Sequence, residues 1–298
     1  MENIRLIING KKSGLEPVRA AIFQARTYSA IDVRVTWESG DVARLVKEAC
    51  EDGCKRLIVG GGDGTVKEIV DAFMHISFDD RPELAILPLG TANDFATACT
   101  IPADYFSALR LAQQGKAHLV DCVKANEQYF INVASGGFGA IVTTSTPVEL
   151  KNFLGGGAYT LNGLVQALSF TPYHGEFILP DISLTSDVIV GAICNSKQAG
   201  GGQQLAPSAL IDDGLLDIVA LLSFPKEHIL QVIDELLNAQ INGDYVKRFR
   251  APWAKWKSDV ELPTNLDGEP IKANEIFYQV MPKAINLVLP EHCPVLMA

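Results

Sequence analysis

Two glycine-rich turns, at residues 60–65 and 87–95, carry the residue types most suited to chemistry. The first reads Gly-Gly-Gly-Asp-Gly-Thr and directly follows the hydrophobic run Leu57–Val59. Because glycine has no Cβ, backbone amides can approach a ligand closely, and a helix N-terminus adds partial positive charge. This combination suits a phosphate group. The alternative is a tight strand-to-helix turn in which Asp63 or Thr65 only caps the helix.

The second turn repeats this arrangement one strand-helix unit later. It reads Leu-Pro-Leu-Gly-Thr-Ala-Asn-Asp-Phe at 87–95 and follows another buried run. The carboxyl ends of neighbouring parallel strands border one crevice, where α/β proteins bind ligands. Neither turn matches the Walker P-loop or the dinucleotide fingerprint. The sequence therefore predicts a phosphate-binding crevice of another type.

The elements that must position these turns are predicted to form two domains, at residues 1–130 and 131–298. The first domain alternates strands with helices, which predicts a parallel sheet in an α/β fold. The second contains short strands separated by Gly, Pro and Asx-Gly signals, which predicts an antiparallel β-sandwich. Its expected strands are 130–133, 187–194, 216–222, 261–266, 277–280 and 285–289, with helices near 159–168 and 226–238.

Composition narrows the classes of partner. The chain of 298 residues has a net charge of −10, which argues against nucleic acid, and 48% hydrophobic residues, which supply packed cores. Residues 128–209 hold few charges, but their many Ser, Thr, Asn, Gln and Gly argue against a membrane span. Six scattered cysteines and the absence of a signal-peptide pattern predict reduced thiols and a cytoplasmic protein.

Taken together, the two turns resemble the diacylglycerol kinase catalytic domain, through Gly61–Thr65 and Leu87–Ala96. Three later segments, Gly200–Gln204, Asp213-Gly214 and Asn265–Pro270, most resemble the bacterial YegS-like lipid kinases, relatives of sphingosine kinases and NAD kinases. The resemblance covers essentially the whole chain. It implies a phosphofructokinase-like parallel-sheet α/β domain followed by a β-sandwich domain that contributes the metal site, the catalytic base and the lipid cleft.

The resemblance also assigns the nucleotide site. It implies that seven consecutive residues cradle the ATP phosphates and that two threonines line the same site: Gly62, Asp63, Gly64, Thr65, Val66, Lys67 and Glu68, with Thr36 and Thr91. Lys67 departs from the family pattern, which usually has Asn at this position.

Phosphoryl transfer requires a divalent cation and carboxylates to hold it. Asp63 and Asp94 are the natural candidates near the phosphates. The resemblance further implies Mg²⁺, or Ca²⁺, at a second-domain turn, held by the Asp213 carboxylate and the carbonyls of Leu210 and Leu215. From spacing alone, Asp-Asp-Gly at 212–214 is a plain β-turn.

Glu269 is the implied catalytic base, which would accept the proton of the lipid hydroxyl. It follows Asp267-Gly268, a dipeptide typical of a hairpin turn. Without the resemblance, Glu269 would be an ordinary exposed strand residue.

Two segments are candidates for contact with lipid. The uncharged stretch 128–173 is predicted to help line the acceptor cleft, with core packing as the alternative. The segment 245–257 contains five basic residues, two tryptophans and no acidic residue, which suits an anionic membrane surface. Its alternative is a solvated face of two strands.

These patterns predict a cytoplasmic, peripherally membrane-associated lipid kinase that uses ATP and Mg²⁺. Its acceptor would be a diacylglycerol- or phosphatidylglycerol-like lipid in phospholipid biosynthesis. The enzyme alternative is an NAD kinase-like protein, although the segment Leu87–Asp94 favours lipid kinases. The other alternative is a non-catalytic nucleotide- or lipid-binding regulator, for which Lys67 is the hint.

Overall fold

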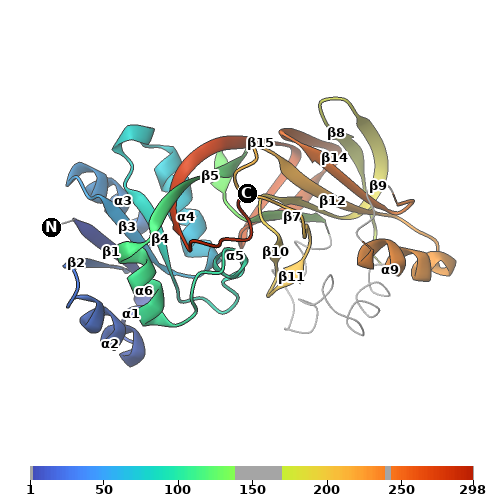
Figure 1. The fold of residues 1–298 in the computed structure, drawn as a ribbon. Helices are drawn as coiled ribbons and strands as arrows, with labels where there is room; N and C mark the ends of the chain where they lie inside the picture. The colour runs from blue at the N-terminus through green and yellow to red at the C-terminus, as the bar shows by residue number, and fades with distance from the viewer. Residues whose placement is uncertain (1–2, 138–169, 239–242, 298) are drawn as a thin grey trace.

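The computed structural model describes residues 3–137, 170–238 and 243–297 and shows a mixed α/β part followed by a β-rich part (Figure 1). Four parallel strands form the N-terminal sheet in the order β4-β3-β1-β2. Their bounds are β1 Ile4–Asn9, β2 Ile31–Thr36, β3 Arg56–Gly61 and β4 Glu83–Pro88. The helices between and after these strands are α1 Gly10–Ser13, α2 Glu16–Ala25, α3 Asp41–Glu51, α4 Asp63–Met74, η1 Phe78–Asp80, α5 Asp94–Ala98 and α6 Tyr105–Gln114.

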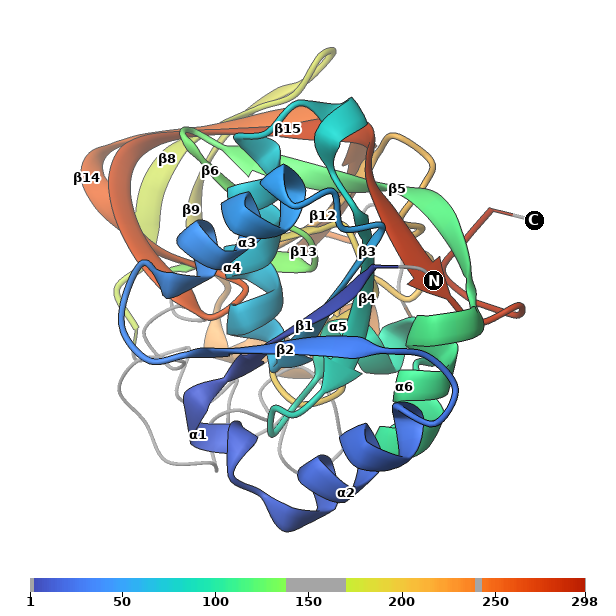
Figure 2. The same ribbon diagram turned by 90° about the vertical axis from the view of Figure 1, so that its left-hand side faces the viewer.

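Helices cover both faces of this sheet (Figure 2). Successive strand residues point to opposite faces, so Leu6 packs with α2 and α6, whereas Ile7 packs with α3 and α4. Both residues have no exposed surface. Burial on both faces explains why the sequence shows continuous apolar runs rather than polar alternation in these strands.

The β-rich part is built mainly from antiparallel strands. Within the residues that the structure describes, its helices are η3 Lys226–His228 and α9 Ile229–Leu237. Its strands, with those leading into it, are β5 Lys116–Ala125, β6 Gln128–Phe130, β7 Val133–Gly137, β8 Tyr173–Ile178, β9 Ser183–Cys194, β10 Gln198–Ala199, β11 Gln203–Gln204, β12 Leu216–Leu222, β13 Val246–Ala251, β14 Trp253–Leu266 and β15 Glu269–Leu289.

Strand β15 joins the two parts of the molecule. It starts as the partner of β14, runs back antiparallel to β5, and places Leu287 beside Leu84 of β4 in parallel register (Figure 1). Among the described residues, β15 thereby links both parts into one sheet of 13 strands. Strand β15 therefore contributes to both sides of the division predicted at residue 130, and antiparallel pairing already begins before it, with β5 and β6.

The strand predicted at 216–222 is β12, those predicted at 187–194 and 261–266 are the ends of the longer strands β9 and β14, and the remaining predicted strands differ from the structure. The strand expected at 130–133 is two strands, because residues 131 and 132 leave the ladder. The strands expected at 277–280 and 285–289 are both parts of β15. The helix expected near 159–168 lies outside the described residues, as does most of the stretch 128–173. No helix within the described ranges is long and apolar enough to cross a membrane.

Candidate active site

The predicted nucleotide residues gather at the carboxyl edge of the parallel sheet. Thr36 ends β2 and pairs with Asn9, the last residue of β1, and Gly61 ends β3 and pairs with Pro88 of β4. This edge is where α/β proteins bind ligands. Asn9 also caps the short helix α1, because its Oδ1 accepts a hydrogen bond from the Lys11 amide at 3.0 Å.

The two glycine-rich turns touch each other through their backbones. A Cβ added to Gly90 would lie 2.6 Å from the Cα of Gly62, and one added to Gly62 would lie 2.9 Å from the Cα of Gly90. Side chains are therefore excluded at both positions. Thr91, by contrast, is exposed in the loop that follows. The contact brings the turn after β3 and the turn after β4 into one surface, as the sequence predicted.

Asp63 stands at the start of α4, and its carboxylate accepts hydrogen bonds from the amides of α5. The distances are 3.2 Å from the Asp94 amide and 3.1 Å from the Phe95 amide. Burial raises the pKa of Asp63, and these two amides oppose the shift. Asp63 thus caps α5 across the two turns, rather than capping its own helix.

The Asp94 side chain connects α5 to the β-rich part. It accepts hydrogen bonds from the Gly201 amide at 2.9 Å and the Gly202 amide at 2.7 Å. Both glycines have positive φ, in the turn between β10 and β11. The Gly200–Gln204 segment noted in the sequence therefore docks onto the second glycine-rich turn. The carboxylates of Asp63 and Asp94 both hold backbone amides here.

Glu269 reaches the first turn of α4 from the β-rich part. Its Oε1 lies 4.0 Å from the position of a Cβ built on Gly64. The pKa of Glu68 is raised mainly by burial, and the nearby negative charge of Glu269 raises it further. The structure therefore brings the predicted base, which is 205 positions later in the chain than Gly64, to the predicted phosphate turn.

Three of the predicted phosphate residues have different surroundings. The side chain of Val66 is buried in the core with α3, so only its backbone amide is available to bind a phosphate. Lys67 is 6% exposed, and its ammonium donates to Gln128 Oε1 on β6 at 3.1 Å. Thr65 packs against Gly61. The lysine that stands at position 67 in place of the usual Asn therefore has a structural role, because it bonds α4 to β6.

The turn predicted to bind metal is rich in carboxylates. The side chain of Asp213 is 7% exposed, its Oδ1 accepts from the Leu215 amide at 3.0 Å, and its Oδ2 pairs with Arg250. Arg250 also lies 3.3 Å from Asp217. Asp121 accepts from the Gly214 amide at 2.7 Å. Within the described part of the chain, no group of three or more His, Cys, Asp or Glu side chains is arranged to hold a metal.

Most cations of the basic segment 245–257 have partners. Arg250 pairs with Asp213, Lys255 with Glu275, and Lys247 and Arg248 bond to backbone carbonyls. Trp256 is buried, and Trp253 packs on Phe277. This distribution favours the alternative of two ordinary strands over a single basic surface. All six cysteines lie in described segments and are free thiols.

Comparison with known proteins agrees with this geometry. The family description of the diacylglycerol kinase catalytic domain matches residues 3–125, and that of the YegS C-terminal NAD kinase beta sandwich-like domain matches residues 132–289. A structure described as a diacylglycerol kinase from Bacillus anthracis superposes with a TM-score of 0.77 at 21% identity, over 97% of each chain.

Two sequence relatives are both named "Probable lipid kinase YegS-like". That of Shewanella frigidimarina is 48% identical over 298 residues, covering 99% of this chain and 96% of its own. That of Chromohalobacter salexigens is 46% identical, covering 96% and 93%. The fold and the paired turns thus define a protein with a diacylglycerol kinase catalytic domain. Within that class, the chain belongs to the YegS-like lipid kinase family.

Proposed function

We propose that this protein transfers the γ-phosphate of ATP to a hydroxyl group of a diacylglycerol- or phosphatidylglycerol-like membrane lipid. The observation that carries the proposal is the approach of Glu269 to Gly64, because it sets a carboxylate of one part against the phosphate turn of the other. The family and its relatives' names support lipid phosphorylation.

In this proposal, the amides of residues 62–68 hold the ATP phosphates at the N-terminus of α4, where the helix dipole favours negative charge. Thr36 and Thr91 complete the site at the same edge. Glu269 accepts the proton of the lipid hydroxyl. At the same time the hydroxyl oxygen forms a bond to the γ-phosphorus, and the bond between that phosphorus and ADP breaks. Positioning and charge neutralisation supply most of the catalysis in such reactions.

The proposal places a divalent cation, Mg²⁺ or Ca²⁺, at the turn of Leu210, Asp213 and Leu215. The donor set fits, because a carboxylate and carbonyl oxygens are the ligands that these ions prefer. The pKa of Asp121 is raised mainly by burial, and the negative charges of Asp213 and Asp212 raise it further. The turn therefore carries an excess of negative charge. A bound cation would lessen this repulsion, and Arg250 is the group that balances part of it.

We expect Asp213→Asn to remove the rise in Tm that saturating Mg²⁺ or Ca²⁺ produces in the nucleotide-free protein. Each kcal/mol of binding energy should raise Tm by about 2–4 °C in a protein of this size. Asp181→Asn changes an exposed carboxylate and should retain the full rise. An equal rise in the Asp213 variant would place the cation elsewhere.

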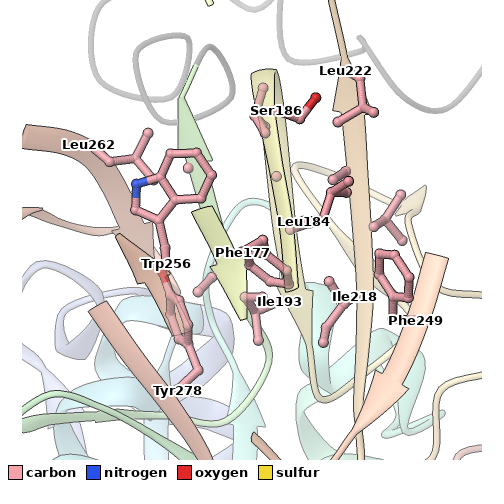
Figure 3. Close-up of a pocket in the computed structure, with 17 residues that line it drawn as sticks. Phe177, Leu184, Ser186, Ile193, Ile218, Leu222, Phe249, Trp256, Leu262 and Tyr278 are labelled. Carbon is pink, nitrogen blue, oxygen red and sulfur yellow. The ribbon is translucent and has the colours of Figure 1, made fainter. Parts of the chain in front are cut away.

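An apolar cavity in the β-rich part is the proposed binding site for the lipid tail (Figure 3). Trp256, Phe177 and Ile218 line it, with Leu262 on the side of β14. Its interior of about 40 Å³ has room for a few water-sized groups, so it suits the end of a chain rather than a headgroup. From Leu262, β14 reaches the turn before Glu269 in four residues, or about 13 Å.

Filling this cavity should reduce the use of long-chain acceptors. Gly191 lines the cavity and has no atom within 4 Å of an added Cβ, so Gly191→Leu should place its side chain in the open space. We expect KM for a long-chain acceptor to rise about tenfold, whereas KM for a short-chain analogue changes less than twofold. Ser186→Ala, at the same wall, should leave both values unchanged. Equal effects on both acceptors would contradict a tail site here.

Transfer of labelled γ-phosphate to diacylglycerol, phosphatidylglycerol, ceramide and NAD tests the function as a whole. The proposal expects a labelled lipid. Labelled NADP would favour the NAD kinase-like alternative, and ATP binding without transfer to any acceptor would favour a regulator.

Three finer assignments belong to the same proposal. The parallel order β4-β3-β1-β2 supports the phosphofructokinase-like description of the N-terminal domain. Because the proposed acceptor is a membrane lipid, the protein would be cytoplasmic and contact the membrane surface peripherally. The same acceptor supports a role in phospholipid biosynthesis. Co-sedimentation with anionic vesicles measures that contact, and failure to co-sediment at low salt would remove it.

A further inference from the structure

The turn that presents Glu269 is built around a buried carboxylate. Leu266 pairs with Glu269 across a two-residue hairpin, and the two turn residues, Asp267 and Gly268, have φ of 48° and 106°. Positive φ at both positions is the geometry of the tight turns that match the twist of paired strands. Such turns are normally exposed, and Gly268 is, but Asp267 is only 8% exposed.

The Asp267 carboxylate accepts three consecutive backbone amides. Its Oδ2 is 2.8 Å from the Ile131 amide and 3.0 Å from the Asn132 amide, and its Oδ1 is 2.7 Å from the Val133 amide. The Asp267 amide in turn donates to the Val133 carbonyl at 3.2 Å. These residues form the crossover between β6 and β7, where the chain passes from the α/β part to the β-rich part.

A hairpin turn alone does not require this arrangement. Asn-Gly or Gly-Gly would form it equally well, and burying a carboxylate costs free energy unless its oxygens are bonded. Burial raises the pKa of Asp267 to about 6, although the three amides oppose the shift. Only a carboxylate offers acceptors on both branches, since asparagine would turn an NH₂ group toward one of the amides. The aspartate at position 267 is therefore required by its bonds to the crossover amides and not by the hairpin turn itself.

Other contacts hold the crossover in place. Asn195 Nδ2 donates to the Ile131 carbonyl at 2.7 Å, and Asn132 Nδ2 donates to the Gln198 carbonyl at 3.0 Å. Gln198 begins the β10–β11 hairpin that docks onto Asp94. The crossover is thus bonded to the β10–β11 hairpin, which docks onto Asp94, and, through Asp267, to the turn of Glu269.

We infer that Asp267 is a positioning residue, which fixes the Glu269 carboxylate against the phosphate turn by anchoring its hairpin to the crossover at 131–133. The inference rests on the proposed role of Glu269 as the base. Asn265 supports the same turn from within, because its Oδ1 accepts from the Gly268 amide at 2.6 Å. Asp267 does not itself touch a reacting group.

The first test is the steady-state kinetics of Asp267→Asn with ATP and a lipid acceptor. We expect kcat to fall at least tenfold, while KM for ATP stays within twofold, because the nucleotide residues lie in the other part of the molecule. Asp259→Asn, an exposed carboxylate on β14, is the matched control and should behave as wild type. An Asp267 variant with wild-type kcat would overturn the inference.

Should Asp267→Asn fail to fold, Asn265→Ala probes the same turn without unpairing the three crossover amides. A fall in kcat at constant KM for ATP supports positioning, and unchanged kinetics overturns it.

A double-mutant cycle separates this inference from the proposed function. If Asp267 acts through Glu269, Asp267→Asn should lower the residual rate of Glu269→Gln by less than twofold. A further tenfold loss in that background would overturn positioning while leaving the base assignment intact. Full activity of Glu269→Gln alone would instead refute the base assignment.

Discussion

Glu269→Gln is expected to lower kcat by about 10³-fold, within the range that a general base contributes. Glutamine keeps the shape of the side chain but does not accept a proton at neutral pH. Because Glu269 is exposed at the start of β15 and forms no part of a core, the fold should tolerate the change. KM for ATP should stay within twofold, since the phosphate turn is unaltered.

The control for this loss is Glu261→Gln, which neutralises an exposed carboxylate on the same hairpin. It should retain wild-type kcat, so that net charge is excluded as the cause. Rates are best measured as transfer of labelled γ-phosphate to the lipid, because residual ATP hydrolysis does not depend on the acceptor. Retention of more than a tenth of the wild-type kcat in Glu269→Gln would rule out the assigned role.

The second large effect is expected from Gly90→Ala and Gly62→Ala. The new Cβ would meet the opposing glycine Cα at 2.6 Å or 2.9 Å, and the obstacle is backbone that cannot rotate away. Separating the turns should cost about 1–3 kcal/mol of unfolding free energy. It should also weaken ATP binding more than tenfold, because the amides around Asp63 and Asp94 shift with the turns.

Gly14→Ala is the matched control. Gly14 has a φ of −84°, and no atom lies within 4 Å of its added Cβ, so alanine should be accommodated there with stability and ATP affinity unchanged. Equilibrium unfolding in urea and titration with ATP give both quantities. Wild-type affinity in Gly90→Ala would show that the contact between the turns is unnecessary for nucleotide binding.

Local pattern was sufficient to predict the elements of the parallel sheet. The run Leu57–Val59 followed by glycines predicts a strand ending in a turn, and β3 ends at Gly61. In the β-rich part, the hydrophobic run 216–222 likewise predicted both ends of the antiparallel strand β12. These predictions succeeded because burial on a strand depends on residues adjacent in sequence.

Long-range partners could not be predicted in this way. Nothing near Asp63 indicates that it caps α5 instead of its own helix, and nothing near Asp267 indicates that it bonds the crossover at 131–133. Both carboxylates bind amides that are brought to them by the tertiary fold. The Asp-Gly dipeptide predicted the hairpin but not the burial of its first residue.

Strand β15 has a consequence for the order in which the protein acquires its structure during synthesis. The N-terminal residues of most chains can fold as soon as they emerge from the ribosome. Here, however, the neighbour of β4 is supplied by residues near position 287, about 200 positions after β4 itself. Until then, one edge of the parallel sheet has unpaired backbone groups, which can associate with other chains. The α/β part is therefore completed only after the residues near position 287 have been made.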